Sequence, residues 1–251
     1  PEEKLVPLRE LLKRRGKGEP LQHLLGSTEF FRREFRTDSR ALIPRPETEE
    51  LVEFALQMAP RRQGMRVLDM GCGSGIIGIT LALELAKQQP EVVMADISEA
   101  ALSLALENAT ALGARVKTYR SDLFTAWDTP AEGAVQPPDL FNLVLANLPY
   151  VPEGEAVSAE VQHDPATALY GGPDGLDIVR RFVKDALPHL DNGALVMLEV
   201  GHDQGEATRA LMEELGYNRT RVLTDMSGKP RFPMGFAPAR PEPTEEAGHD
   251  G

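Results

Sequence analysis

The chain has 251 residues, of which 41% are hydrophobic and 26% are charged, so it can bury a full core as one large domain or one domain with an appendage. Its formal net charge of -12 argues against binding of nucleic acid through phosphate contacts, which needs a basic face. A single cysteine, Cys72, excludes an internal disulfide framework. No apolar run approaches the roughly 20 residues of a membrane span and the first residues do not resemble a signal peptide, so we expect a cytoplasmic protein.

The chain begins with a predicted amphipathic helix. Leucines at helical spacing place it at residues 3–15, and the Gly- and Pro-containing segment 16–20 ends it. Residues 1–45 hold eleven Lys and Arg against seven Asp and Glu, which is net +4 on an acidic chain. This basic stretch indicates either a solvated helix face or a docking surface for a partner.

A β-hairpin is predicted next, over residues 28–43. Its strands are placed at 29–31 and 41–43, around a polar turn at 37–39. Pro46 then opens a helix, because proline suits the first helical turn and the acidic residues that follow suit the positive end of the helix dipole.

Beyond this point the chain alternates between strands and helices. Strands are predicted at 66–70, 91–96, 115–120, 140–146, 194–200, 220–224 and 231–236. Helices are predicted at 47–59, 75–88, 98–112, 174–188 and 203–215. The alternation favours an α/β fold with a doubly wound, mostly parallel sheet, whose last two strands form an antiparallel edge. The resulting divisions are a partial helical N-terminal domain (1–27), a β-hairpin linker (28–46), a main domain (47–236) and a Pro- and Glu-rich disordered tail (237–251).

A glycine-rich turn follows the first strand of the main domain, with the sequence Asp69-Met70-Gly71-Cys72-Gly73-Ser74-Gly75. Its glycines permit a close approach of the backbone to a ligand, and residues 73–78 match the dinucleotide fingerprint G-x-G-x-x-G. Asp96 ends the next strand, where a carboxylate accepts the ribose hydroxyls of either NAD or S-adenosylmethionine. Asp69 favours the latter, because it would repel a pyrophosphate and attract the ammonium group of a methionine moiety; alternatively, it caps backbone N–H groups of the loop. Cys72 is interpreted as a small filler, since no neighbouring base activates it.

The tetrapeptide Asn147-Leu148-Pro149-Tyr150 ends the apolar run 140–146 and is suited to holding a planar NH2 group. An amide nitrogen is a poor nucleophile and needs two hydrogen-bond acceptors to aim it. The side-chain oxygen of Asn147 supplies one acceptor and the Leu148 carbonyl the second, directed by the fixed φ of Pro149. Tyr150 offers an aromatic face to the planar group. Two acceptors select an NH2 group over a carbonyl, and catalysis can then be mainly positioning.

These motifs resemble the HemK/PrmC family, the peptide chain release factor glutamine methyltransferases, over about residues 19–236. The segments that carry the resemblance are Leu42-Ile43-Pro44-Arg45-Pro46-Glu47-Thr48-Glu49, Gln22-His23-Leu24-Leu25-Gly26, Pro165-Ala166-Thr167-Ala168-Leu169, Gly171-Gly172-Pro173-Asp174-Gly175-Leu176 and Glu199-Val200-Gly201. The resemblance implies a seven-stranded, Rossmann-like class I methyltransferase domain with a small, here shortened, helical domain for substrate docking. It implies methylation of the side-chain amide nitrogen (N5) of the glutamine in the Gly-Gly-Gln motif of class I release factors, with S-adenosylmethionine as donor and S-adenosylhomocysteine as by-product.

The resemblance also implies residue roles. The methyl donor would contact Asp69, Gly71, Cys72, Gly73, Ser74, Gly75, Asp96 and Asn147, with Asp122 and Leu123 beside the adenine. Catalysis and substrate binding would fall to Asn147, Leu148, Pro149 and Tyr150. Arg45 and Glu47 either line the substrate pocket or only start a helix. No metal is expected, because the histidines lack metal-ligand spacing.

Leu148 departs from the family's usual Asn-Pro-Pro-Tyr, and Asn-Leu-Pro-Tyr is also similar to the motif of ribosomal RNA adenine dimethyltransferases. An RNA or DNA adenine N6-methyltransferase is therefore the alternative, opposed by the net charge of -12 and by the segment 43–49. A third hypothesis, a nicotinamide enzyme or a catalytically silent cofactor-binding module, is opposed by Asp69 and the tetrapeptide. The expected partners are release factors, with no membrane and no direct nucleic-acid binding.

Overall fold

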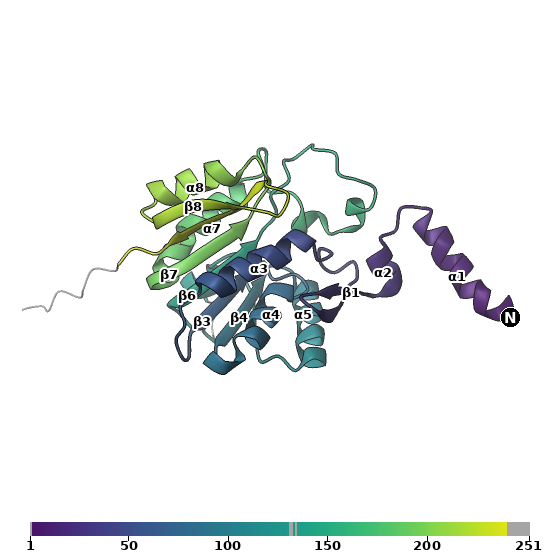
Figure 1. The fold of residues 1–251 in the computed structure, drawn as a ribbon, viewed down its shortest axis with the longest axis horizontal. Coiled ribbons are helices and arrows are strands. Elements are labelled where there is room, and N and C mark those ends of the chain that lie inside the picture. Colours follow the sequence, from purple (N-terminus) through teal and green to yellow (C-terminus); the bar gives the residue numbers. More distant parts are fainter. Residues whose placement is uncertain (1, 131–132, 134, 240–251) are drawn as a thin grey trace, which may run out of the picture.

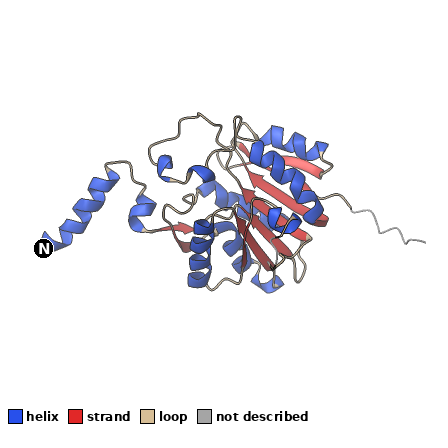
Figure 2. Ribbon diagram, turned by 180° about the vertical axis from the view of Figure 1, so that it is seen from behind, coloured by secondary structure: helices blue, strands red, loops and turns tan. Residues whose placement is uncertain are grey.

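The computed structural model describes residues 2–130, 133 and 135–239, which build a seven-stranded sheet with helices on both faces (Figures 1 and 2). From one edge to the other the strands are β5 (Lys117–Arg120), β4 (Glu91–Asp96), β3 (Arg66–Met70), β6 (Phe141–Asn147), β7 (Leu190–Glu199), β9 (Pro230–Phe236) and β8 (Asn218–Thr224). The first five are parallel, and β9 is antiparallel to both β7 and β8. The predicted sheet, including its antiparallel edge, is confirmed.

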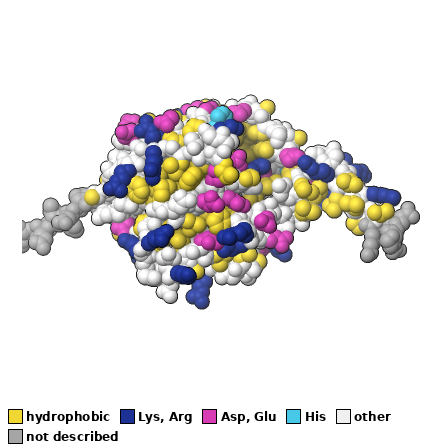
Figure 3. Space-filling model, in the orientation of Figure 1, with side chains coloured by type: hydrophobic (Ala, Val, Ile, Leu, Met, Phe, Trp, Pro, Cys, Tyr) yellow, Lys and Arg dark blue, Asp and Glu magenta, His cyan; other side chains and the backbone are white. Residues whose placement is uncertain are grey.

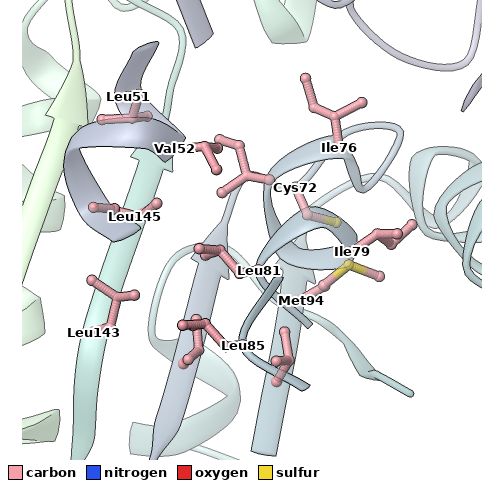
Figure 4. Close-up of a cluster of buried hydrophobic side chains, with 14 of the residues drawn as sticks. Leu51, Val52, Cys72, Ile76, Ile79, Leu81, Leu85, Met94, Leu143 and Leu145 are labelled. Carbon is pink, nitrogen blue, oxygen red and sulfur yellow. The ribbon is translucent and has the colours of Figure 1, made fainter. Parts of the chain in front are cut away.

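Two helical layers cover the sheet because successive side chains of each strand point to opposite faces. Val67 of β3 belongs to the cluster under one layer, and Leu68 to the cluster under the other. The first layer consists of α3 (Pro46–Met58), α4 (Ile76–Glu84) and α5 (Glu99–Leu112), and Figure 4 shows Leu51 of α3 near Leu145 of β6 in the cluster that this layer covers. The second layer contains α6 (Thr125–Asp128), α7 (Asp177–Ala186) and α8 (Gly205–Glu214). Short 3-10 helices occur at η1 (Ala86–Gln88), η2 (Val161–His163), η3 (Ala166–Ala168) and η4 (Leu187–His189).

The β-hairpin is shorter than predicted. It pairs β1 (Ser27–Phe30) with β2 (Arg33–Arg36), and its turn is Phe31-Arg32, both with positive φ, of 49° and 61°. The predicted turn at 37–39 and second strand at 41–43 are therefore wrong. The reason is that the two-residue turn has none of the Gly or Asn residues that normally mark positive φ. Residues 41–45 instead form a connecting segment that leads to the functional site.

The N-terminal helix is confirmed as α1 (Glu2–Arg15), and it is followed by the short α2 (Leu21–Leu25), which was not predicted. Figure 1 shows α1 projecting away from the sheet, and Figure 3 shows apolar and basic side chains mixed over it. Leu5, Leu8 and Leu12 are 46%, 51% and 62% exposed, so their helical spacing does not serve a core in this chain. Arg15 forms an ion pair with Glu160, which ties the end of α1 to the loop before η2.

The sheet also fixes where a ligand can bind. The chain runs outward from β3 to β4 and β5 on one side, and from β6 to β7 on the other, so the strand order reverses between β3 and β6. In doubly wound folds the crevice at the carboxyl ends of such neighbouring strands is the usual ligand site. Within the described residues, no helix is both long and apolar enough to cross a bilayer. The predicted tail falls largely on residues 240–251, outside the described residues.

Candidate active site

Two neighbouring cavities lie at the carboxyl ends of β3, β4 and β6. The first has a volume of about 370 Å³ and is lined by the glycine-rich turn, Asp96 and Asp122. The second, of about 340 Å³, is lined by Glu47, Tyr150 and Glu199. The residues that line both are Leu42, Arg45, Asn147 and Ala168. Asn147 therefore lies where a molecule in one cavity would meet a molecule in the other.

The glycine-rich turn forms the wall of the first cavity. The N–H groups of Gly71 and Cys72 both donate to the carbonyl oxygen of Ala95 on β4, at 2.8 and 3.0 Å. Gly71 has φ +72°, and a Cβ atom there would lie 2.8 Å from Cδ2 of Leu148. The turn therefore packs closely against the tetrapeptide, and both the positive φ and this close contact favour glycine. Cys72 is buried, and burial raises the pKa of its thiol well above the ordinary value, which agrees with its interpretation as a filler.

Asp69 lies behind this wall. It is fully buried and lines neither cavity, and its Oδ2 accepts a hydrogen bond of 2.8 Å from the N–H of Gly78 in α4. Burial raises its pKa to about 7. Its Oδ1 has no hydrogen-bond partner among the described residues. The structure thus gives Asp69 the capping role that was its alternative interpretation, and the contact with an ammonium group stays a prediction.

Asp96 is placed at the cavity wall by two backbone groups. Its Oδ2 accepts from Gly73 N–H at 2.9 Å and its Oδ1 from Ser98 N–H at 2.8 Å. Burial raises the pKa of Asp96 and these hydrogen bonds lower it. The effect of burial is larger, so the pKa lies above its ordinary value. Each oxygen keeps a lone pair for a ribose hydroxyl. The neighbouring Ile97 also lines the cavity and is 55% exposed, an apolar surface suited to a flat base.

Asp122 and Leu123 line the far side of the first cavity. Leu123 is buried with φ 50°, and Asp122 accepts a hydrogen bond of 3.0 Å from Arg181 of α7. Arg181 and Ile97 line the cavity but were missed by sequence reasoning, because neither belongs to a motif whose chemistry indicates a ligand.

The tetrapeptide is distributed over both cavities. Leu148 and Pro149 line the first, Tyr150 lines the second, and Asn147 lines both. Tyr150 is largely buried, which raises the pKa of its hydroxyl to about 12, so it stays neutral. Its carbonyl accepts a hydrogen bond of 2.9 Å from Nε2 of Gln204, and Gly175 passes so close that a Cβ there would lie 2.1 Å from the same oxygen. The backbone after Asn147 is therefore held from two sides.

Two buried side chains, Thr48 and Glu199, meet the half-buried Asn147 of the tetrapeptide. Asn147 Nδ2 donates to Thr48 Oγ1 at 3.1 Å, and Thr48 Oγ1 donates to Glu199 Oε2 at 2.7 Å. Thr48 is 0% and Glu199 2% exposed. Burial raises the pKa of Glu199 to about 7, while its hydrogen bonds with Thr48 and Asn147 act in the opposite direction. Glu199 belongs to a segment that carries the family resemblance, but the sequence does not indicate it as a site residue, because its partners lie on other elements.

Arg45 and Glu47 line the second cavity and also lie at the N-cap and in the first turn of α3, so both features of the two interpretations are present, and their contact with a substrate stays a prediction. Arg45 pairs with Asp164 at 2.8 Å, and the side chain of Asp164 is 0% exposed. Asp164 also accepts a hydrogen bond from the N–H of Ile43 at 3.2 Å. Burial raises the pKa of Asp164, and both contacts lower it. This buried carboxyl group connects the segment 41–45 to the loop around residue 164, which borders the cavities.

Comparisons with known proteins agree with this geometry. Residues 49–164 match the family model described as "Methyltransferase small domain". A release factor glutamine methyltransferase from Koribacter versatilis is 37% identical over 232 residues, 91% of this chain and 79% of the relative. A protein of the same name from Deinococcus radiodurans is 39% identical over 223 residues, 88% of this chain and 76% of the relative. The crystal structure of a methyltransferase from Pyrococcus furiosus has the same fold, with a TM-score of 0.58, 16% identity, and coverage of 93% of this chain and 99% of that one.

Proposed function

Because the chain belongs to the HemK/PrmC family of release factor glutamine methyltransferases, we propose that it methylates the N5 nitrogen of the glutamine in the Gly-Gly-Gln motif of class I release factors. The observation that carries the proposal is the position of Asn147 between two cavities, one suited to a nucleoside and one to a side chain. Asn147 then contacts the methyl donor and the glutamine at the same time.

The first cavity fits S-adenosylmethionine. These lining residues would hold the donor, with Asp96 binding its ribose hydroxyls and Ile97 with Leu123 packing against its adenine. Ser74 lines the cavity with a buried hydroxyl that has no hydrogen-bond partner among the described residues. A buried polar atom without a hydrogen-bond partner lowers stability, and a polar group of a ligand in this cavity would give the Ser74 hydroxyl its partner. When bound, the donor supplies an electrophilic methyl group on a positive sulfonium.

The tetrapeptide supplies positioning. Asn147 Oδ1 accepts one N–H of the glutamine amide and the carbonyl of Leu148 accepts the other, which aims the nitrogen at the first cavity. Tyr150, neutral at all working pH values, packs against the planar amide from the second cavity. The nitrogen gains the methyl group as the methyl–sulfur bond of the donor breaks to leave a neutral thioether, and it releases one of its two protons to water.

Release factors are therefore the proposed partners, and the cytoplasm, where translation ends, the proposed place of action. Adenine in RNA remains the competing substrate, because Leu148 lies where the family usually has proline. The net charge of -12 opposes that alternative.

The test is to incubate the protein with labelled S-adenosylmethionine and a purified class I release factor. A Gly-Gly-Ala version of the factor and a structured ribosomal RNA serve as parallel substrates. We expect label only on the factor that carries glutamine, and loss of that label with Asn147→Ala. Label on RNA, or equal label on the Gly-Gly-Ala factor, would overturn the proposal.

A further inference from the structure

The side-chain amide of Asn147 ends in an oxygen and an NH2 group, which have nearly equal shape and opposite hydrogen-bonding character. The oxygen accepts, and the NH2 group donates. Only the orientation with Oδ1 towards the second cavity holds a substrate NH2 group, since the reverse orientation sets donor against donor. Something in the structure must therefore fix this orientation.

The hydrogen bonds from Asn147 to Thr48 and from Thr48 to Glu199 have a defined direction. In its ionised form the Glu199 carboxylate only accepts, and Thr48 then donates its single hydroxyl proton to Glu199 Oε2. The Thr48 oxygen is then left as an acceptor, and it takes a proton from Nδ2 of Asn147. Once Nδ2 faces Thr48, Oδ1 faces away from it.

The arrangement of the elements makes this relay rigid. Asn147 and Glu199 are paired in register on the neighbouring strands β6 and β7, and Thr48 reaches them from the first turn of α3. Thr48 and Glu199 are buried, so water competes little for the hydrogen bond between them.

We propose that Glu199 is a positioning residue that, through Thr48, holds the Asn147 amide with its oxygen towards the substrate and so makes the second cavity selective for an NH2 group. This inference rests on the proposed function. It assigns to Glu199 no contact with the reacting atoms. Its consequence is a preference for glutamine over glutamate at the same position of the substrate.

The test compares a release factor carrying Gly-Gly-Gln with one carrying Gly-Gly-Glu, used as a competitive inhibitor. Glu199→Gln can donate as well as accept, so Thr48 can reverse and Asn147 can turn. We expect turnover of the Gln factor to fall about tenfold or more, with unchanged affinity for S-adenosylmethionine, and the preference for the Gln factor over the Glu factor to fall by a similar factor.

Removing a negative charge would by itself favour a glutamate ligand, and Glu47→Gln controls for this. Glu47 lines the same cavity and raises the pKa of Glu199 by its charge, but it makes no hydrogen bond with Asn147 or Thr48 among the described contacts. The change in preference must be larger for Glu199→Gln than for Glu47→Gln. Equal changes would overturn the inference, as would a loss of turnover matched by an equal loss of donor affinity.

Thr48 gives a second pair of variants, which decides the matter if Glu199→Gln does not fold. Thr48→Val keeps the shape and the charge of Glu199 but removes the hydroxyl, whereas Thr48→Ser keeps the hydroxyl. We expect the preference for the Gln factor to fall in Thr48→Val and to return in Thr48→Ser, and equal preferences in the two would refute the relay. If the unchanged protein does not methylate the Gln factor at all, the proposed function fails rather than this inference.

Discussion

Replacing Gly71 with alanine is expected to damage both the donor wall and the tetrapeptide, because the new Cβ atom would lie 2.8 Å from Cδ2 of Leu148. Two costs contribute. Alanine at φ +72° enters the left-handed region, which costs about 1–2 kcal/mol. Leu148 is buried and must shift, which adds an overpacking cost of about 1–3 kcal/mol. The free energy of unfolding should therefore fall by about 2–5 kcal/mol.

Gly113→Ala is the matched control. Gly113 ends α5 with φ +68°, and a Cβ atom there meets nothing within 4 Å, so it bears the backbone cost alone. Urea unfolding measures both variants, and calorimetry with S-adenosylmethionine measures the donor affinity, which should drop only for Gly71→Ala. Adding Leu148→Ala to Gly71→Ala removes the clash, so the double variant should lose less stability than the two single changes predict. Equal effects of Gly71→Ala and Gly113→Ala on stability and donor affinity would refute the reasoning.

Three further predictions follow from buried polar groups. Burial raises the pKa of Asp69 from 3.8 to about 7, so the folded protein keeps a proton that the unfolded chain releases between those pH values. The free energy of unfolding should therefore fall as pH rises through this window, by at most about 4 kcal/mol. Urea unfolding of both proteins from pH 4 to 8 should show a smaller fall in Asp69→Asn. Ser74→Ala should leave the stability of the free protein unchanged or slightly higher and weaken S-adenosylmethionine binding about fivefold, and unchanged affinity in calorimetry would contradict the assigned contact. Arg45→Met should cost about 1–3 kcal/mol of unfolding free energy because Asp164 stays buried without its partner, and much of this loss should return in the double variant with Asp164→Asn.

Most of the fold could be predicted from the sequence because hydrophobic runs and their spacing carry the sheet and the main helices. The predictions failed where local signals were weak. The turn Phe31-Arg32 adopts positive φ without glycine. The start of β7 at Leu190 rather than 194 was missed because the next three residues, Asp-Asn-Gly at 191–193, are not apolar and are partly or fully exposed. The five-residue α2 is too short to show a helical period.

The candidate site could be predicted as far as it lies in contiguous motifs. The glycine-rich turn, Asp96 and the tetrapeptide each follow a strand, and the topology brings those strand ends together. Glu199 could not be found in this way, since its role depends on a side chain from α3 and another from β6. The importance of Asp164 appears only in the structure, because the Arg45 and Ile43 groups that share its carboxylate lie about 120 residues away along the chain.

The contacts that orient Asn147 also bear on when the enzyme can first become active during its own synthesis. Thr48 is 99 residues from Asn147 and 151 residues from Glu199 along the chain, so these hydrogen bonds belong to the non-local contacts that form late. Domains made on the ribosome are completed from the N-terminus, and Asn147 emerges well before Glu199. A nascent chain that stops before β7 already carries the glycine-rich turn and the tetrapeptide, but its acceptor oxygen has no fixed direction until β7 joins β6.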